Sequence, residues 1–358
     1  MSIALSWRAV ATPQELGELR RQWDELAVAV EQPFAAPAWA LAWWEQLRPE
    51  GAELRIVAVH EGEQLVGIAP MHLTGGALRP LGKGVAAAEP IAAPGREAEV
   101  APLLAAGLAA ASPSSVWLET AASSPQWAGL LTASWPKGAR SWEVSSEPLP
   151  RVDLGGGYEA WLKGKSGSFR RENKRKHKKL AEAGGEFRFA DAETLADDVS
   201  AFMRLHRARL AGQGGSSLTD AGVDRMLVEV GGELLASGRF RLLCMEVEGQ
   251  VVAGQVLLAA GRELSAWNSG FDEAYAKFSP SMQCLIHALK DGSERGESRM
   301  SLGPGAQDYK YRLSDSEDNA VTHALLPRGG GYPLARARLA STQLRKRLAQ
   351  ELRSRRAS

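Results

Sequence analysis

Apolar and polar positions follow the same pattern in two parts of the chain. Each part contains two apolar runs separated by a Glu-Gly turn, Glu61-Gly62 in the first part and Glu248-Gly249 in the second. Apolar runs rich in β-branched residues on either side of such a turn are typical of a β-hairpin. We therefore predict strands over residues 54–59, 64–71, 240–247 and 251–258.

A further strand, a helix and a buried strand follow each hairpin. The predicted helices cover residues 98–111 and 280–291, and the predicted buried strands cover residues 116–119 and 299–302. The second helix is the better defined, since Ser279 is a predicted N-cap and Pro280 suits the first helical position. Its apolar positions recur at helical spacing and predict a buried face made of Met282, Leu285, Ile286 and Leu289. Two copies of this order of elements predict one α/β (α+β) fold used twice.

Two runs of three glycines, at residues 155–157 and 329–331, bracket the second part of the chain. Glycine clusters of this kind mark loops and boundaries. We predict one domain over residues 1–150, a second over residues 151–328 and a basic tail helix over residues 332–358. Each domain is expected to be a mixed sheet flanked by helices.

Composition narrows the class of protein without changing this picture. The chain has 358 residues, of which 44% are hydrophobic and 24% charged, as in ordinary folded proteins. Its net charge of +1 argues against a surface built for nucleic acid. The two cysteines, Cys244 and Cys284, lack the spacing of a zinc site or disulfide framework, so we expect no metal. Because the start lacks a signal pattern and the longest apolar stretch, residues 101–111, is too short to span a bilayer, we expect a cytoplasmic protein.

A set of short motifs in the second part resembles a known family. They are Ser168-Phe169-Arg170-Arg171, Lys179-Leu180, Gly184, Val247-Glu248-Gly249, Gly254, Gly270-Phe271-Asp272, Ser279-Pro280, Leu302-Gly303 and Tyr309-Lys310. In order and spacing they resemble the CelD-type GNAT acyltransferases, a family associated with polysaccharide biosynthesis and distantly similar to the Fem peptidyltransferases. The resemblance is strong from Val152 to Pro327 and loose before that, and it implies two tandem GNAT-like domains.

The resemblance also implies where an acyl-coenzyme A donor binds. Strands four and five of the fold, residues 263–268 and 299–302, would splay apart and hold the donor's pantetheine in the gap. The chain departs from the family at Ser281, where glycine is usual, and at Ser301, where aspartate is usual. Serine does not reach a positive φ as cheaply as glycine, which disfavours a close backbone approach to the donor's pyrophosphate.

Three residues are candidates for catalysis. Lys310 could meet a phosphate or a developing oxyanion, or it could be a surface lysine whose stem packs beside tyrosines. The resemblance places a Tyr-Lys pair at the same point, so Tyr309 is the second candidate. Asp272 could orient an acceptor amine or act as a general base, or it could bond its own backbone in a turn.

Four residues are candidates for binding the donor. Asn268 could hydrogen-bond the pantetheine amides, or it could be a polar residue of an edge strand. Ser279, Ser281 and Met282 lie at the predicted helix start, where unpaired N–H groups attract phosphate. The alternative there is an ordinary capped helix that binds nothing.

Positive charge gathers in two segments. Residues 168–180 predict a helix with Arg170, Arg171 and Arg175 among many cations, either a solvated face or a site for an anionic donor or acceptor. In the tail, Leu344, Leu348 and Leu352 form an apolar stripe among basic residues, which predicts weak contact with an anionic membrane.

We expect an acyltransferase that moves an acyl group from coenzyme A to an amine or hydroxyl of a sugar, peptide or lipid precursor. The first domain would be a degenerate copy that shapes the acceptor groove. One alternative is a Fem-like transferase with an aminoacyl-tRNA donor, although no aromatic residues interleave the basic helix to stack bases. The other is an inactive GNAT fold that serves as an interaction module.

Overall fold

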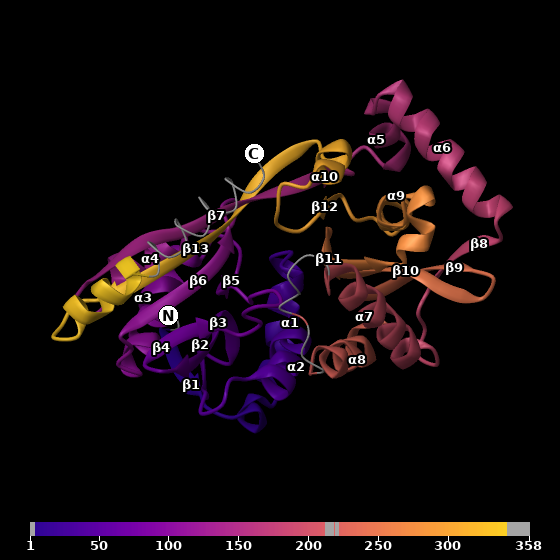
Figure 1. The fold of residues 1–358 in the computed structure, drawn as a ribbon. Helices are drawn as coiled ribbons and strands as arrows, with labels where there is room; N and C mark the ends of the chain where they lie inside the picture. Colours follow the sequence, from indigo (N-terminus) through magenta and orange to yellow (C-terminus); the bar gives the residue numbers. More distant parts are fainter. Residues whose placement is uncertain (1–3, 212–217, 219–221, 342–358) are drawn as a thin grey trace.

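A computed structural model describes residues 4–211, 218 and 222–341 (Figure 1). The strands pair into one continuous mixed sheet, flanked by helices. We refer to the segment from β1 (Leu5–Val10) to β7 (Ala139–Asp153) as the first half and to the rest as the second half. The predicted α/β class, with mixed sheets flanked by helices, is confirmed.

The same order of strands occurs in both halves. The first half contributes β1 (Leu5–Val10), β2 (Glu53–Glu61), β3 (Gln64–Thr74), β4 (Ala77–Pro80) and β6 (Ser115–Ala121), with the short β5 (Ile91–Ala92) beside β3. The second half contributes β8 (Gly185–Phe189), β9 (Phe240–Val247), β10 (Gln250–Ala260), β11 (Glu263–Phe271) and β12 (Arg299–Ser301). In each series three antiparallel pairings precede one parallel pairing, β4 with β6 and β11 with β12. The predicted hairpins around Gly62 and Gly249 are confirmed as β2–β3 and β9–β10.

The two halves exchange their last strands at the centre of the sheet. Strand β13 (Ser316–Pro327), from the second half, pairs antiparallel with β6 of the first half. Strand β7 (Ala139–Asp153), from the first half, pairs antiparallel with β12 of the second half. The two also pair with each other along their whole shared length, as the long ribbons in Figure 1 show. The boundary predicted at residues 150 and 151 therefore falls inside a strand, and separating the halves would break this sheet.

The helices occupy matching places in the two halves. Two helices separate the first and second strands, α1 (Leu19–Ala29) and α2 (Pro37–Leu47) in one half and α7 (Leu195–Ala211) and α8 (Gly222–Leu234) in the other. In the first half, α3 (Glu97–Ala110) precedes β6 and the short α4 (Trp127–Ser134) follows it. In the second half, α9 (Pro280–Glu294) precedes β12 and the short α10 (Asp308–Leu313) follows it. The second half starts with α5 (Tyr158–Gly164) and α6 (Gly167–Glu182). Short 3-10 helices within the described residues cover Pro13–Leu16, Pro33–Ala35 and Glu273–Phe278.

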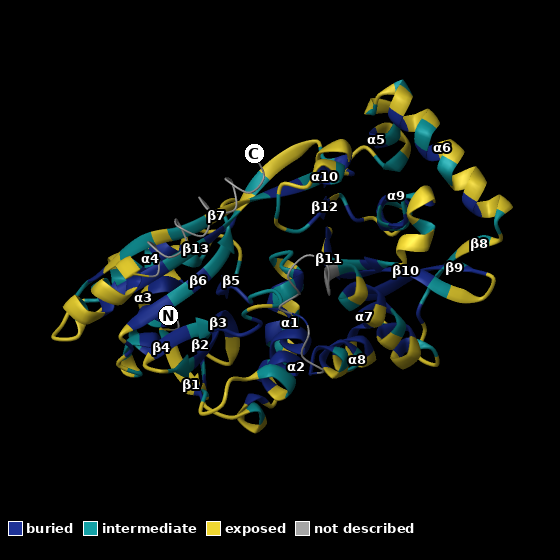
Figure 2. Ribbon diagram, in the orientation of Figure 1, coloured by how far each residue is buried: buried dark blue, intermediate teal, exposed yellow. Residues whose placement is uncertain are grey.

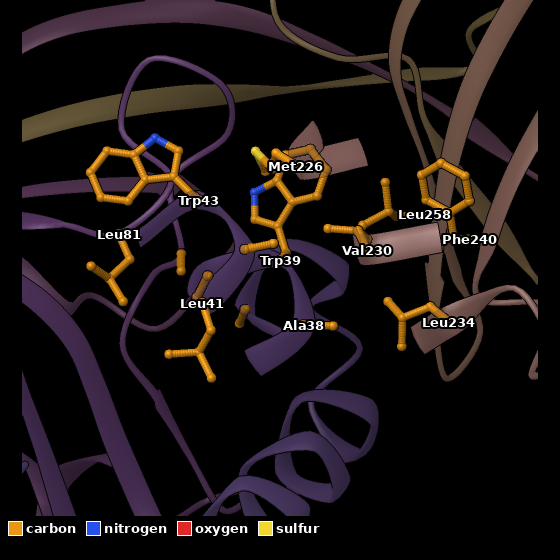
Figure 3. Packing of buried hydrophobic residues seen from close by; sticks show 14 of the residues in the cluster. Ala38, Trp39, Leu41, Trp43, Leu81, Met226, Val230, Leu234, Phe240 and Leu258 are labelled. Carbon is orange, nitrogen blue, oxygen red and sulfur yellow. The ribbon is translucent and has the colours of Figure 1, made fainter. Parts of the chain in front are cut away.

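A hydrophobic core with residues from both halves joins them. Figure 3 shows Trp39 of α2 beside Met226 of α8, with Trp43 on the side of Leu81, in a cluster that continues to Phe240 and Leu258. Trp39 is fully buried and Trp43 is 3% exposed, so both side chains pack inside this core. Burial of aromatic side chains of this size is worth several kcal/mol, and it fixes the halves relative to each other.

One expectation about the ends of elements is wrong, and a second is confirmed only over the residues that the structure describes. Ser279 does not cap α9 with its side chain, because its backbone is in the left-handed conformation at φ 55° and its hydroxyl accepts a bond from Lys176 instead. Residues 332–341 of the predicted tail helix are helical, and the stripe of Leu344, Leu348 and Leu352 lies outside the described residues. Within the described ranges, no helix combines the length and apolarity needed to cross a membrane.

Candidate functional site

Strands β11 and β12 form a fork. They pair over only three residues, Glu263 to Ser265 against Arg299 to Ser301, although β11 continues to Phe271. A register shift opposite Val256 and Leu257 places a β-bulge at Trp267 in β11. The backbone of β11 beyond Ser265 therefore has no strand partner on its β12 side. The carbonyl oxygens of Asn268 and Ser269 accept from the side chains of Gln255 and His206, and other peptide groups of this stretch can bond a ligand in the gap. The predicted splaying of these strands is present.

The fork opens into a cavity of ≈ 1160 Å³ that both halves line. Trp267, Asn268, Tyr309 and Lys310 line it from the second half, and Glu89 lines it from the first. A cavity of this size takes a ligand larger than a simple metabolite. The described residues include no cluster of His, Cys, Asp or Glu that could hold a metal ion.

Lys310 is buried, not a snorkelling surface lysine. It is 5% exposed, and its ammonium donates to the carbonyl oxygens of Gly303 at 2.9 Å and Pro304 at 2.7 Å. Burial lowers the pKa of Lys310 to about 8, and the Glu147 carboxylate opposes that shift. The ammonium therefore fixes the loop after β12 while it lines the cavity.

The neighbouring Tyr309 is half-buried and lines the same cavity. Burial raises the pKa of its phenol above its ordinary value, whereas Arg209 opposes the shift. The hydroxyl stays protonated at neutral pH and is a proton donor at the cavity wall. The structure thus brings the two leading catalytic candidates together at the fork.

The start of α9 lies beside the outer end of β11. The Ser281 hydroxyl is 3.4 Å from that of Ser269, which also accepts from Arg209 at 3.3 Å. Lys176 of α6 reaches Ser279, and the first turn of the helix contains no acidic residue. These cations and hydroxyls stand where the helix N-terminus already favours an anion.

The remaining predicted site residues, Asn268, Met282 and Asp272, lie in three different environments. Asn268 lies in the fork and lines the cavity, as expected for a donor contact. Met282 is 7% exposed and belongs to the apolar core under α9, in agreement with its place in the predicted buried stripe. Asp272 is exposed, accepts a bond from the Ala274 backbone at 2.9 Å and does not line the cavity, so it has the turn role rather than a position for general-base chemistry.

Helix α6 carries the predicted cations on an exposed face (Figure 2). Arg170 donates to the Lys163 carbonyl oxygen at 3.1 Å. Arg171 and Arg175 are exposed and form no ion pair with any residue in the described ranges. Neither they nor Arg170 line the cavity, so an anion bound by them would lie outside it.

Glu89 is the cavity residue that the sequence analysis missed. It lies in the loop between β4 and β5, is 6% exposed, and its Oε1 accepts from the Ser124 hydroxyl at 3.0 Å. Its Oε2 is buried with no hydrogen-bond partner in the described part of the chain. Burial raises its pKa to about 8, against the opposing effects of Ser124 and Arg151. A lone carboxylate within the apolar run at residues 85–93 was the available signal.

Comparison with known proteins supports the fold of this site. Residues 167–311 match a family model described as an acetyltransferase (GNAT) domain. That range contains the fork, α9, Tyr309 and Lys310. The predicted GNAT fold of the second half is therefore confirmed. No curated protein matches the chain.

Solved structures resemble the chain well beyond that range. The C-terminal domain (DUF2156) of a putative lysylphosphatidylglycerol synthetase from Agrobacterium fabrum is 13% identical, with a TM-score of 0.56, covering 89% of this chain and 95% of that chain. FemX is 10% identical, with a TM-score of 0.59, covering 84% of this chain and 95% of that chain. A tandem GNAT protein from the clavulanic acid biosynthesis pathway is 14% identical, with a TM-score of 0.46, covering 91% of this chain and 100% of that chain. The first two share the fold of this chain across both of its halves.

Proposed function

We propose that the protein transfers an acyl group from an acyl-coenzyme A thioester to an amine or hydroxyl of a sugar, peptide or lipid precursor. The observation that carries the proposal is the fork, where the unpaired edge of β11 opens into a large cavity beside the start of α9. The extended pantetheine can add to the free strand edge through its amides, and the pyrophosphate can lie at the helix start. The resemblance to CelD-type proteins supports a role in polysaccharide or envelope biosynthesis.

Tyr309 and Lys310 have separate tasks in this proposal. Attack on the thioester places negative charge first on the carbonyl oxygen and then on the leaving sulfur. The Tyr309 hydroxyl can protonate the sulfur, since burial keeps the phenol protonated. Lys310 holds the Gly303-Pro304 loop against the cavity and adds positive charge near the reacting carbonyl.

The equivalent helix of the first half is unsuited to a diphosphate. The first turn of α3 contains Glu97 and Glu99, and the Glu97 carboxylate already accepts from the Gly95 backbone at 3.3 Å. Negative charge at a helix start repels phosphate, whereas the first turn of α9 carries none. The donor is therefore proposed to bind only the second half, and the first half to shape the acceptor side of the cavity.

Ligand co-purification tests the proposal directly. Mass spectrometry of the small molecules and nucleic acids released from the purified protein is expected to find coenzyme A or an acyl-coenzyme A. Isothermal titration is expected to show coenzyme A binding that Tyr309→Phe retains, with acyl transfer reduced. A protein that binds no coenzyme A would support the interaction-module alternative and refute the proposal.

One observation favours the second candidate, a Fem-like enzyme with an aminoacyl-tRNA donor. The exposed cations of α6 that lack ion pairs could neutralise several phosphates of an RNA stem. Replacing Arg171, Arg175 and Lys179 by glutamate separates the two donors. With a coenzyme A donor, we expect a loss of affinity of about 1 kcal/mol through a partly screened field. Tight binding of bulk tRNA that weakens steeply with salt, and disappears in the variant, would overturn the coenzyme A assignment.

A further inference from the structure

Helix α6 presents a row of cations to solvent. Arg171, Arg175 and Lys179 follow one another at four-residue spacing, so they lie along one side of the helix, with Lys174 next to them. All four are exposed, and none forms an ion pair with a residue in the described ranges. Like charges at this spacing repel each other and destabilise a helix. The row therefore costs α6 stability unless an anionic partner covers it.

The row stands beside the start of α9, at the edge of the donor fork. Figure 1 shows α6 at the outer edge of the second half, close to α9. Lys176, which follows Arg175 in the helix, donates to the Ser279 hydroxyl at the start of α9. Two residues further on, the Ser281 hydroxyl is 3.4 Å from that of Ser269, which lines the cavity. A series of contacts thus leads from the row to the cavity that holds the proposed donor.

The first half has no counterpart of α6 among the described residues. Its first element is β1 (Leu5–Val10), whereas α5 and α6 precede the matching strand β8 in the second half. The helix that carries the row therefore accompanies only the half in which the donor is proposed to bind. A function of the row that is connected with the donor explains this difference between the halves.

The positive field of the row is narrow. From Arg171 to Lys179 the row extends over about 12 Å of helix. Cations on either side of it are paired, Arg312 with Glu172 at 2.6 Å and Lys178 with Glu182 at 3.6 Å. A nucleic-acid stem or a bilayer spreads its phosphates over a wider area, and α6 exposes no large apolar side chain that could enter a bilayer. One acidic helix of a small protein matches the length and charge of the row.

The start of α9 also suits a donor with a single phosphate. Ser281 is the second residue of α9, and its side chain occupies space beside Ser269 that a glycine would leave open. Coenzyme A carries a diphosphate next to its pantetheine, whereas a carrier protein holds the same pantetheine through one phosphodiester on a serine. The phosphodiester needs less of the room that Ser281 restricts. Lys176 and the helix N-terminus supply the positive charge for either group.

We propose that the row on α6 is the docking surface for a small acidic carrier protein whose phosphopantetheine arm enters the fork. The protein then accepts acyl groups from a carrier-bound thioester as well as from coenzyme A. This inference rests on the proposed function, because the two donors share the pantetheine arm, and it adds a second donor and its binding surface. In the transfer, the acceptor nitrogen or oxygen bonds to the acyl carbon, the C–S bond breaks, and the proton lost by the acceptor balances the free thiol of the carrier.

Titration with the acyl carrier protein of bacterial fatty-acid synthesis tests the surface. The holo form bears the phosphopantetheine arm, and its affinity for the full chain is measured by fluorescence anisotropy at two salt concentrations. Combining Arg171→Glu, Arg175→Glu and Lys179→Glu is expected to weaken holo-carrier binding by about 100-fold, since each reversed surface charge costs about fivefold. Coenzyme A binding is expected to weaken by only about fivefold, which also shows that the variant is folded. Wild-type affinity for the carrier that does not fall as salt rises would contradict electrostatic docking.

A second triple variant is the matched control. Arg8→Glu, Lys137→Glu and Arg140→Glu reverse three exposed cations of the first half and change the net charge by the same amount. None of the three residues lines the cavity, so holo-carrier affinity is expected to stay within twofold of the wild type. An equal loss in both triple variants would show that net charge alone attracts the carrier, and it would refute a docking surface on α6.

Competition with coenzyme A tests whether the arm enters the fork. The holo carrier is expected to bind at least about 10-fold more tightly than the apo carrier, which lacks the arm, and to lose this advantage when coenzyme A saturates the protein. Equal binding of the two forms, unaffected by coenzyme A, refutes the connection between the row and the fork.

The same titrations separate the possible failures. If neither coenzyme A nor the holo carrier binds the wild type, the proposed function is wrong. If coenzyme A binds and the holo carrier does not, only the inference is wrong. Bulk tRNA or phosphatidylglycerol vesicles that bind the wild type, displace the carrier and fail to bind the α6 variant would assign the row to that partner and overturn the inference.

Discussion

Replacing Glu89 by glutamine is expected to change the stability of the protein more favourably at pH 7 than at pH 5. Burial raises the pKa of this carboxyl from its ordinary value of 4.5 to about 8. Between these two values the folded chain holds a proton that the unfolded chain releases, so the free energy of unfolding of the wild type falls as pH rises. Above about pH 8 both states are ionised, and the loss reaches its full extent. Glutamine has no proton to release, so the variant lacks this slope.

The size of the effect follows from the same two values. Each pKa unit corresponds to about 1.36 kcal/mol, so the wild type loses about 1 kcal/mol by pH 5 and roughly 3 kcal/mol by pH 7. The amide also changes the bonding at Ser124 and leaves its NH₂ group unpaired, at a cost of about 1–3 kcal/mol that does not depend on pH. The quantity to measure is therefore the difference in stability between the variant and the wild type at the two pH values, which we expect to shift in favour of the variant by about 2 to 3 kcal/mol from pH 5 to pH 7.

Urea denaturation of the wild type and Glu89→Gln at pH 5 and pH 7 measures this quantity. Other titrating groups are common to both proteins and cancel in the comparison. Protein without added ligand is required, because a ligand that contacts Glu89 would change its protonation. A stability difference that is the same at both pH values would show that Glu89 is not protonated in the folded state, and it would refute the reasoning from its burial.

Three further changes test the packing around the site. Lys310→Met removes two bonds to the Gly303-Pro304 loop and is expected to cost about 1–3 kcal/mol in thermal unfolding; an unchanged melting temperature would show that the bonds are dispensable. Gly270→Ala places a Cβ atom 2.6 Å from the His206 backbone nitrogen of α7 and is expected to destabilise by about 1–3 kcal/mol, whereas Gly232→Ala on α8 meets nothing within 4 Å and serves as the control in the same assay. Truncation after residue 331 is expected to abolish weak, salt-sensitive binding to anionic vesicles; binding that survives high salt would contradict an electrostatic contact of the tail.

Local order along the chain could be predicted from the sequence because its causes are local. The β2–β3 and β9–β10 hairpins follow from apolar runs around Glu-Gly turns, and Pro280 marks the start of α9. The fork between β11 and β12 was expected only through the resemblance to a family, since no property of either strand alone makes them diverge. Ser279 shows the limit of local reasoning, since its side chain bonds Lys176 of another helix instead of capping its own.

Tertiary structure decided the features that join distant parts of the chain. The exchange of β7 and β13 depends on pairing between residues such as Pro327 and Ala139, which no local pattern specifies. The burial of Lys310 depends on a loop that folds over it, and the placement of Glu89 depends on Trp267, 182 residues beyond the Val85 carbonyl that it bonds. Whether a side chain is charged, buried or partnered is set by such contacts, because desolvation and hydrogen bonding act through space and not along the sequence.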